Sequence, residues 1–394
     1  MGETSCAKAT SDKQYSTSRR DRPVRSSGEQ SEMAQEQLQW WQKALLPFSI
    51  LYAAGLEVYL WWRLPRQFRA PAVVISVGNL SLGGTGKTPT VVAICRHLQQ
   101  RGFKVGILSR GYGGTLSRSG GIVSDGQRVL ATSAQAGDEP LLLARQLPGV
   151  PVLVGKDRRR TARWAVERFG CEVLVLDDGF QYWQLHRDVD LVLLDGERPF
   201  GNGQTLPAGT LREPVHHLQR ADALLIQGQL CPGLPERFPA LPCFLWQKAP
   251  ARVRALRSGS PFACLSCLQG KRVLAVAAIA SFDSFPAVLA RLGAQVVDVW
   301  RLPDHHRYTT DDLAEAQRRA QACQVEVIVV TEKDAVKLEE MSEMSLQVPI
   351  WVLDIEAKFS DGFWRWLDAR VRAAQHAAAC TAAAEEGSGE EEEP

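Results

Sequence analysis

The stretch "AVVISVGNLSLGGTGKTPT", residues 72–90, joins an apolar run to a glycine-rich turn and then to a helical pattern. A phosphate-binding loop needs inward-pointing backbone N–H groups, a lysine and a hydroxyl, and the glycines at 83, 84 and 86, Lys87 and Thr88 supply them. The strict pattern G-x-x-x-x-G-K-[ST] has glycine where this chain has Ser81. Serine is acceptable there if its backbone needs no positive φ. The stretch predicts a phosphate-binding loop; the alternative is a strand-to-helix turn without a ligand.

Apolar runs alternate with helical patterns beyond this stretch. Near-continuous Val, Ile and Leu indicate strands buried on both faces, and hence a largely parallel sheet covered by helices. We therefore expect an α/β fold with a phosphate-loop NTPase-like domain at 70–230, a linker region at 231–265 and a second, smaller α/β domain at 266–375. The expected strands are 72–79, 104–112, 150–155, 171–178, 189–196, 221–228, 271–280, 294–302, 325–334 and 349–355, and the expected helices are 88–101, 157–169, 283–292 and 310–323.

Composition excludes some classes of function. The chain has 394 residues, 45% of them hydrophobic, and a net charge of +2, which gives no argument for a nucleic-acid partner. Nine scattered cysteines indicate a reducing compartment. The motif "CLSC" at 264–267 has metal-ligand spacing, but no second such pair accompanies it, so zinc is not favoured there. Residues 1–35 and 376–394, a polar leader and an acidic tail, are expected to be disordered.

One hydrophobic segment, residues 40–66, has the composition of a membrane anchor. "ALLPFSILYAAGLEVYLWWR" is interrupted by one acid, Glu57, and tryptophans bracket it at both ends, as in interfacial segments. Pro47 is expected in the first helical turn and Pro65 after the last, which leaves about 17 residues, at the short edge of spanning length. Spanning and lying in the interface both remain open, and the alternative is an amphipathic core helix.

Polar residues just beyond strand ends are the candidates for chemistry, because ligands of such sheets bind outside the carboxyl ends of the strands. Asp177 and Asp178 follow the run "VLVL", where phosphate-loop proteins place a magnesium-organising aspartate; a helix cap or turn is the alternative. Asp138 opens a helical stretch, where an ordinary N-cap is the alternative. His305 follows a strand of the second domain, where a structural role is the alternative.

Together these residues resemble a known family. "SVGNLSLGGTGKTP", "GDEP", "LDDGFQ", "DGERPFGNGQTLPAGTLREP", "PDHH" and "TEKDAVK" occur in the order seen in tetraacyldisaccharide 4′-kinases, the lipid A kinases of Gram-negative bacteria. The resemblance runs from about residue 40 to 370. The segment "RPFGNGQTLPAGTLREP" is long and unusual, which makes the set specific.

The resemblance implies transfer of the γ-phosphate of ATP, with Mg²⁺, to the 4′-hydroxyl of a tetraacylated glucosamine disaccharide 1-phosphate. It also implies an active site between two α/β/α domains and attachment to the cytoplasmic face of the inner membrane. Asp138 would be the general base oriented by His305, and Arg212 would neutralise charge. Asp177, Asp178 and Glu213 would organise magnesium or the phosphates. ATP would be held by Ser81, Leu82, Gly83, Gly84, Thr85, Gly86, Lys87 and Thr88.

Two other functions remain to be weighed against a kinase. A phosphate-loop switch or metallochaperone would control a partner through its nucleotide state, but a guanine-reading N-K-x-D is not found in the sequence. An inactive membrane-bound relative would be expected to have lost the lysine, the threonine or the acids, and all of them are present. The hydrophobic segment favours the lipid kinase, because its substrate resides in the bilayer.

Overall fold

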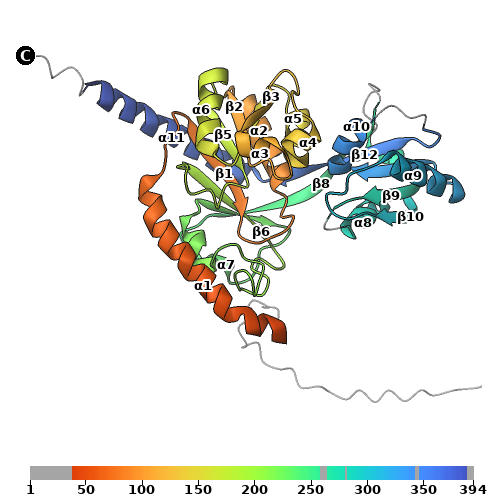
Figure 1. Cartoon of the computed structure of the whole chain (residues 1–394), viewed down its shortest axis with the longest axis horizontal. Coiled ribbons are helices and arrows are strands. Elements are labelled where there is room, and N and C mark those ends of the chain that lie inside the picture. Colours follow the sequence, from red (N-terminus) through yellow and green to blue (C-terminus); the bar gives the residue numbers. More distant parts are fainter. Residues whose placement is uncertain (1–37, 258–263, 280–281, 342–345, 388–394) are drawn as a thin grey trace, which may run out of the picture. The chain divides into compact units, whose positions relative to one another are not determined.

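The computed structural model describes residues 38–257, 264–279, 282–341 and 346–387 (Figure 1). They form an α/β fold in which helices cover a long sheet, so the expected fold class is confirmed. The leader predicted at 1–35 lies outside the described residues.

The strands match the predicted apolar runs to within a few residues, and two further strands, β3 and β8, appear. Their bounds are β1 Val73–Asn79, β2 Val105–Ser109, β3 Gly121–Asp125, β4 Pro151–Val154, β5 Val173–Asp177, β6 Val189–Asp195, β7 Ala223–Gln227, β8 Cys243–Ala255, β9 Arg272–Ala277, β10 Gln295–Arg301, β11 Val327–Thr331 and β12 Ile350–Phe359.

The four predicted helices are α2, α6, α8 and α9 of the structure. The helices are α1 Trp40–Arg63, α2 Lys87–Gln100, α3 Leu116–Ser119, α4 Ser133–Ala136, α5 Asp138–Gln146, α6 Arg158–Phe169, α7 Leu234–Arg237, α8 Ser284–Arg291, α9 Thr310–Ala322, α10 Glu332–Glu339 and α11 Asp361–Gly387, with 3₁₀ turns η1 Leu64–Arg66, η2 Val215–Arg220 and η3 Leu265–Leu268.

The described strands form one sheet of twelve in the order β10-β9-β11-β12-β8-β7-β6-β1-β5-β2-β4-β3. Neighbours are parallel except for the antiparallel pairs β12·β8 and β3·β4. The largely parallel sheet is therefore as predicted. Because the strands of 70–230 and 266–375 belong to one hydrogen-bonded sheet, the division into two domains stays a prediction.

Strand β1 shows why its residues must be apolar on both faces. Val73, Ile75 and Val77 face a core built with α2, α5 and α11, whereas Val74 faces a core built with α6. All four side chains are almost completely buried. Burying one such side chain stabilises the fold by roughly 1.5–3 kcal/mol, which accounts for the continuous apolar run in the sequence.

Strand β8 corrects the expectation of a linker at 231–265. It is 13 residues long and pairs with β12 from Ala255 opposite Trp351 to Trp246 opposite Phe359. Pro250 lies opposite Ile355 at a register shift, and a bulge is one of the few places where a sheet accepts proline. Of the prolines in this segment, Pro250 is therefore accommodated within the strand, whereas Pro232, Pro235, Pro239 and Pro242 precede it.

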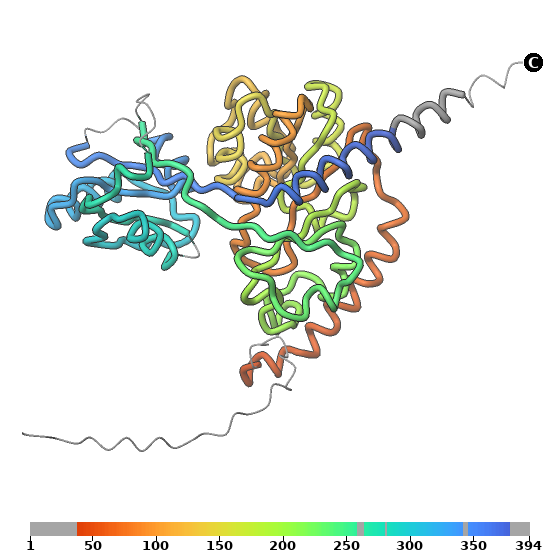
Figure 2. Tube along the Cα trace, turned by 180° about the vertical axis from the view of Figure 1, so that it is seen from behind, coloured from red at the N-terminus to blue at the C-terminus, as the bar shows by residue number. Residues whose placement is uncertain are grey.

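The middle of β8 and β12 is a two-stranded ribbon. β7 pairs with β8 only as far as Trp246, and β11 pairs with β12 only as far as Leu353. Between these points β8 and β12 are paired with each other and with no other described strand. Figure 2 shows β8 and β12 running together between the two halves of the sheet. The first half contains β7, β6, β1, β5, β2, β4 and β3, and the second half contains β11, β9 and β10.

Helix α1 begins at Trp40, so Pro47 lies inside it and not in its first turn as predicted. Its apolar segment is long enough to cross a membrane, by length and composition, and only 11% of the most apolar window is buried. A core helix would be mostly buried, so that alternative is disfavoured. Trp40, Phe48, Ile50 and Trp61 are among its exposed side chains.

Helix α11 corrects the boundary of the predicted acidic tail. Residues 376–387 continue the helix that begins at Asp361, and 388–394 lie outside the described residues. The segment "RAAQHAAACTAAAEE" is rich in alanine, the residue with the highest helix propensity, which explains the extension.

Candidate active site

The glycine-rich loop lies between β1 and α2, and Gly86 is the N-cap of α2. Its φ is +84°, in the left-handed region, and a Cβ there would lie 2.3 Å from the ring of Trp246. Backbone and packing therefore both require glycine. Ser81 instead forms an antiparallel bridge with Leu211 and has no positive φ, so serine fits where the strict pattern has glycine.

The segment Thr210–Arg212 lies beside this loop and brings an arginine to it. The amide of Leu82 donates to the carbonyl of Thr210 (2.8 Å), and the amide of Arg212 donates to the carbonyl of Leu80 (2.8 Å). With its backbone fixed in this way, Arg212 donates through Nη1 to both carboxylate oxygens of Asp178, at 2.9 and 2.8 Å.

Lys87, Asp177, Asp178 and Arg212 form what we name the loop-edge cluster. Lys87 Nζ donates to Asn79 Oδ1 (3.1 Å) and lies 3.5 Å from Asp178 Oδ1. Burial alone would raise the pKa of Asp178, but Lys87 and Arg212 outweigh it and hold that pKa below its ordinary value. Asp178 also has a φ of +54°, which is uncommon for a non-glycine residue. The cluster therefore holds an ionised carboxylate between two cations at the mouth of the loop.

Asp177 is the buried member of the cluster. Ser109 Oγ donates to its Oδ2 at 3.1 Å, while its Oδ1 is buried without a hydrogen-bond partner among the described residues. Burial, together with the nearby charges of Glu139 and Asp178, raises its pKa to about 6. A buried carboxylate oxygen without a partner is costly, and a hard divalent cation would satisfy it. This observation fits a magnesium site.

Asp138 is the first residue of α5, and its side chain points to the other half of the sheet. Its Oδ2 lies 3.2 Å from His305 Nδ1 and 3.0 Å from Lys337 Nζ. Lys337 also donates to the carbonyl of His306 at 3.0 Å, which ties the histidine segment to α10. The N-cap alternative for Asp138 is wrong, because Gly137 holds the N-cap position and no side chain caps the helix.

A second ion pair stands beside the first. Lys333 Nζ donates to Glu139 Oε1 at 2.5 Å, so adjacent acids of α5 meet two lysines that are one turn apart on α10. Burial would raise the pKa of Glu139, but Lys333 holds it below its ordinary value. Arg145 and Glu339 form a further ion pair between the same two helices. Helix α10 therefore fixes the position of the head of α5.

Two residues of β8 cover the loop. Trp246, 1% exposed, lies against Gly86, and Lys248 Nζ donates to the carbonyl of Gly84 at 3.3 Å. Burial lowers the pKa of Lys248. The ribbon strand therefore contributes both an aromatic wall and a cation to the surroundings of the loop.

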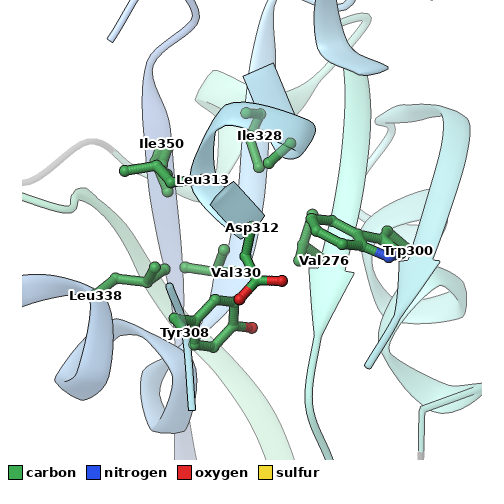
Figure 3. A pocket seen from close by; sticks show the side chains of 10 residues that line it. Val276, Trp300, Tyr308, Asp312, Leu313, Ile328, Val330, Leu338 and Ile350 are labelled. Carbon is green, nitrogen blue, oxygen red and sulfur yellow. The ribbon is translucent and has the colours of Figure 1, made fainter. Parts of the chain in front are cut away.

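A separate pocket in the second half of the sheet contains none of the predicted site residues. Figure 3 shows Tyr308 and Asp312 among apolar side chains from β9, β11 and α9, including Val276 and Ile328. Burial raises the pKa of Tyr308 above its ordinary range. The pocket therefore belongs to the apolar core of this half and not to the site around the loop.

Glu213 faces away from the loop-edge cluster, although it follows Arg212 in the chain. Its Oε2 lies 2.7 Å from His217 Nδ1 and accepts from Arg220 Nη2 at 2.6 Å. No hydrogen bond or ion pair between the described residues joins it to the cluster. Its Oε1 is buried without a hydrogen-bond partner among the described residues, and its expected role as a magnesium ligand stays a prediction.

Glu57, Glu213, His216 and His217 form a second group, which we name the helix-side cluster. His216 Nε2 and His217 Nε2 each lie 2.8 Å from Glu57 Oε1 on α1. Tyr52 Oη, also on α1, donates to the carbonyl of Arg212 at 2.8 Å. The helix is therefore attached to the same segment that supplies Arg212.

The "CLSC" motif gains no further ligands in the structure. Cys264 Sγ and Cys267 Sγ are 3.7 Å apart and exposed or half-buried. Of the described His, Cys, Asp and Glu residues, the group whose ligand atoms converge closely enough for a metal is Glu57, His216 and His217.

Comparison with known proteins matches most of this chain to one family. The sequence model of the family described as tetraacyldisaccharide-1-P 4′-kinase matches residues 41–372. The chain belongs to this family. Members described as tetraacyldisaccharide 4′-kinase from Syntrophus aciditrophicus and Pelobacter propionicus are 41% and 43% identical to it. The alignments cover 79% and 75% of this chain and 87% and 82% of the relatives.

A solved structure of the family has the same fold. The LpxK structure from Aquifex aeolicus, determined in complex with ATP, is 29% identical, with a TM-score of 0.68 over 84% of this chain and 99% of that chain. The resemblance proposed from the sequence motifs is therefore confirmed.

Several residues of this family member escaped the sequence reasoning. Lys337 and Lys333 stand in the motif "TEKDAVK", and their spacing of four on a helix beyond a strand was the available signal. Trp246 carried no such signal, because it lies in a proline-rich segment. The adjacent pair His216 and His217 meets Glu57 only because α1 packs against η2, and no pattern in the sequence indicates that packing.

Proposed function

We propose that this chain transfers the γ-phosphate of ATP to the 4′-hydroxyl of a tetraacylated disaccharide 1-phosphate. The single observation that carries the proposal is the convergence of His305 and Lys337 on Asp138, from the other half of the sheet. Family membership supplies the substrate class, since the relatives are named for this activity.

The loop residues 81–88 would hold ATP, and Thr88 and Asp177 would hold the magnesium ion. The unpartnered buried Oδ1 of Asp177 and the buried side chain of Thr88 support this assignment. Magnesium would neutralise charge on the β- and γ-phosphates. Lys87 and Arg212 would stabilise the charge of the transferred group, and Asp178 positions both of them.

Asp138 would accept the proton of the sugar hydroxyl. His305 and Lys337 both contact Oδ2, and Oδ1 has no hydrogen-bond partner among the described residues, so that oxygen is available to the substrate. A positioned base contributes about 10²–10⁴-fold to such a step. His305 orients the carboxylate from the second half of the sheet, and Lys337 fixes the segment that carries the histidine.

Helix α1 would bind the membrane surface with its exposed aromatic and aliphatic face. Its middle is hydrogen-bonded to the protein: Ser49 Oγ donates to the carbonyl of Thr205 (2.9 Å), and Glu57 contacts two histidines. A helix whose centre is docked on the body fits the interface better than a bilayer-spanning position. ATP and the arginines after α1 favour the cytoplasmic face of the inner membrane.

The decisive experiment is an assay of the full chain with ATP, Mg²⁺ and the disaccharide 1-phosphate in mixed micelles. We expect a product with one added phosphate, located at the 4′ position by tandem mass spectrometry. Lys87→Ala is the matched inactive control. ATP hydrolysis without a phosphorylated lipid would overturn the kinase assignment in favour of a nucleotide-dependent switch.

A further inference from the structure

The helix-side cluster has no part in the proposed phosphoryl transfer, yet its geometry is unusual. His217, only 5% exposed, lies between two carboxylates, with Nδ1 2.7 Å from Glu213 Oε2 and Nε2 2.8 Å from Glu57 Oε1. Both distances are those of strong, charge-assisted hydrogen bonds.

A neutral imidazole cannot satisfy both carboxylates. It carries one N–H, so it donates at one nitrogen and presents a lone pair at the other. Glu213 is completely buried and fixed by Arg220 as well, so the N–H belongs at Nδ1. The lone pair of Nε2 then faces the carboxylate of Glu57, and a cation is needed between these two atoms.

His216 adds a third donor at the same point. Its Nε2 also lies 2.8 Å from Glu57 Oε1, and its ring is edge-on to that of His217, with centroids 4.6 Å apart. One ligand atom from each of Glu57, His216 and His217 lies within 4.8 Å of the others. Donors around a tetrahedral zinc ion are about 3.3 Å apart, so a small movement of the exposed Glu57 side chain would admit the ion.

We propose that Glu57, His216 and His217 bind a divalent transition-metal ion, with zinc as the best match. Two imidazoles and one carboxylate suit zinc and disfavour magnesium, which prefers oxygen ligands. Glu213 on Nδ1 of His217 is the carboxylate–histidine arrangement that fixes the tautomer and orientation of a metal-binding imidazole. The exposed side of the site, at Glu57 and His216, leaves the fourth position to water.

The metal would fasten α1 to the body of the protein. Glu57 is on α1, whereas both histidines are on η2, four and five residues after Arg212. The ion would join the two elements through three strong bonds in place of two hydrogen bonds. Metal binding therefore stabilises the docked position of the helix beside the segment that supplies Arg212.

The test uses the full chain, stripped of metal with a chelator and then titrated with Zn²⁺ alone. We expect one zinc per chain by calorimetry and elemental analysis, a rise of several degrees in melting temperature, and slower tryptic cleavage after Arg63 and Arg66. Co²⁺ should give the visible absorption of a four-coordinate ion with nitrogen ligands, and Mg²⁺ should give none of these effects.

Matched variants separate the site from other histidine–carboxylate pairs. His216→Ala and Glu57→Gln should each lower zinc affinity at least tenfold, while His186→Ala, which removes a histidine paired with Asp188, should leave it unchanged. Zinc stoichiometry and cobalt spectra that are the same in His216→Ala as in the parent would overturn the proposal. So would absence of zinc binding by the folded parent, which would leave a proton as the shared cation. Kinase activity is not a readout here, so failure of the kinase assignment leaves this result intact.

Discussion

Arg212 and Glu213 are consecutive residues that serve two different clusters. Arg212 reaches the loop-edge cluster and binds both oxygens of Asp178, whereas Glu213 reaches the helix-side cluster and binds His217 and Arg220. The loop-edge cluster gathers at the carboxyl ends of β1 and β5, which the fold brings together. The helix-side cluster exists only where α1 lies against η2. The rule that ligands bind beyond the carboxyl ends of the strands therefore predicts the loop-edge cluster but not the helix-side cluster.

Lys87→Ala should give the largest effect. We expect turnover to fall by several orders of magnitude while melting temperature stays within a degree or two, because Lys87 faces the loop and not a core. Steady-state kinetics and calorimetry on the same preparation measure both. Lys156→Ala, on a loop between β4 and α6, is the matched control. Near-normal turnover in well-folded Lys87→Ala protein would show that the loop-edge cluster has no role in phosphoryl transfer.

Asp138→Ala should follow, with turnover lowered about 10²–10⁴-fold and the apparent KM for ATP little changed. Adding His305→Ala should cost little more, because the two residues act as one unit. Turnover of the two single variants and the double variant measures the coupling. Losses that simply multiply would contradict the pair, even if each residue mattered alone.

Asp177→Asn should lose activity but gain stability in the absence of nucleotide and metal. Folding raises the pKa of Asp177 from an ordinary 3.8 to about 6, so burial disfavours the ionised form. Ionisation of Asp177 therefore takes at most about 3 kcal/mol from the stability of the parent as the pH rises from about 4 to 6. The variant lacks this loss, while the other carboxyls act alike in both proteins. Urea unfolding at pH 4 and pH 8 checks this: a gain at pH 8 and none at pH 4 is expected. An equal gain at both pH values would exclude the carboxylate as its cause.

Tyr52→Phe should give the smallest effect. It tests whether the contact of α1 with Arg212 influences the loop-edge cluster. It removes one hydrogen bond, to the carbonyl of Arg212, worth about 1 kcal/mol. We expect a small fall in melting temperature and unchanged turnover at saturating substrate. Tyr59→Phe is the control, since its ring packs on Trp183 without a described hydrogen bond from its hydroxyl. A large loss of turnover in Tyr52→Phe alone would show that the two clusters are coupled through Arg212.

The sequence was most informative where a local pattern determines a local structure. Val73–Asn79 is buried on both faces and therefore reads as a continuous apolar run, and Gly86 is required by its φ. β8 was missed because its segment has many prolines and few periodic runs, and the acceptable position of Pro250 depends on β12. The contact of Lys337 with Asp138 joins residues 199 positions apart, and no periodicity in either segment encodes such a pairing.

The two-stranded ribbon in the middle of β8 and β12 has a mechanical consequence. A pair of strands twists far more readily than a wide sheet, because no third strand resists the rotation. A rotation of the two halves about this ribbon would leave its ladder intact, but it would have to break the ion pairs of Asp138 with Lys337 and of Glu139 with Lys333. The pairing of β8 with β12 would keep the backbone amides of the ribbon hydrogen-bonded during such a rotation, so its resistance would come from these ion pairs and not from the strands.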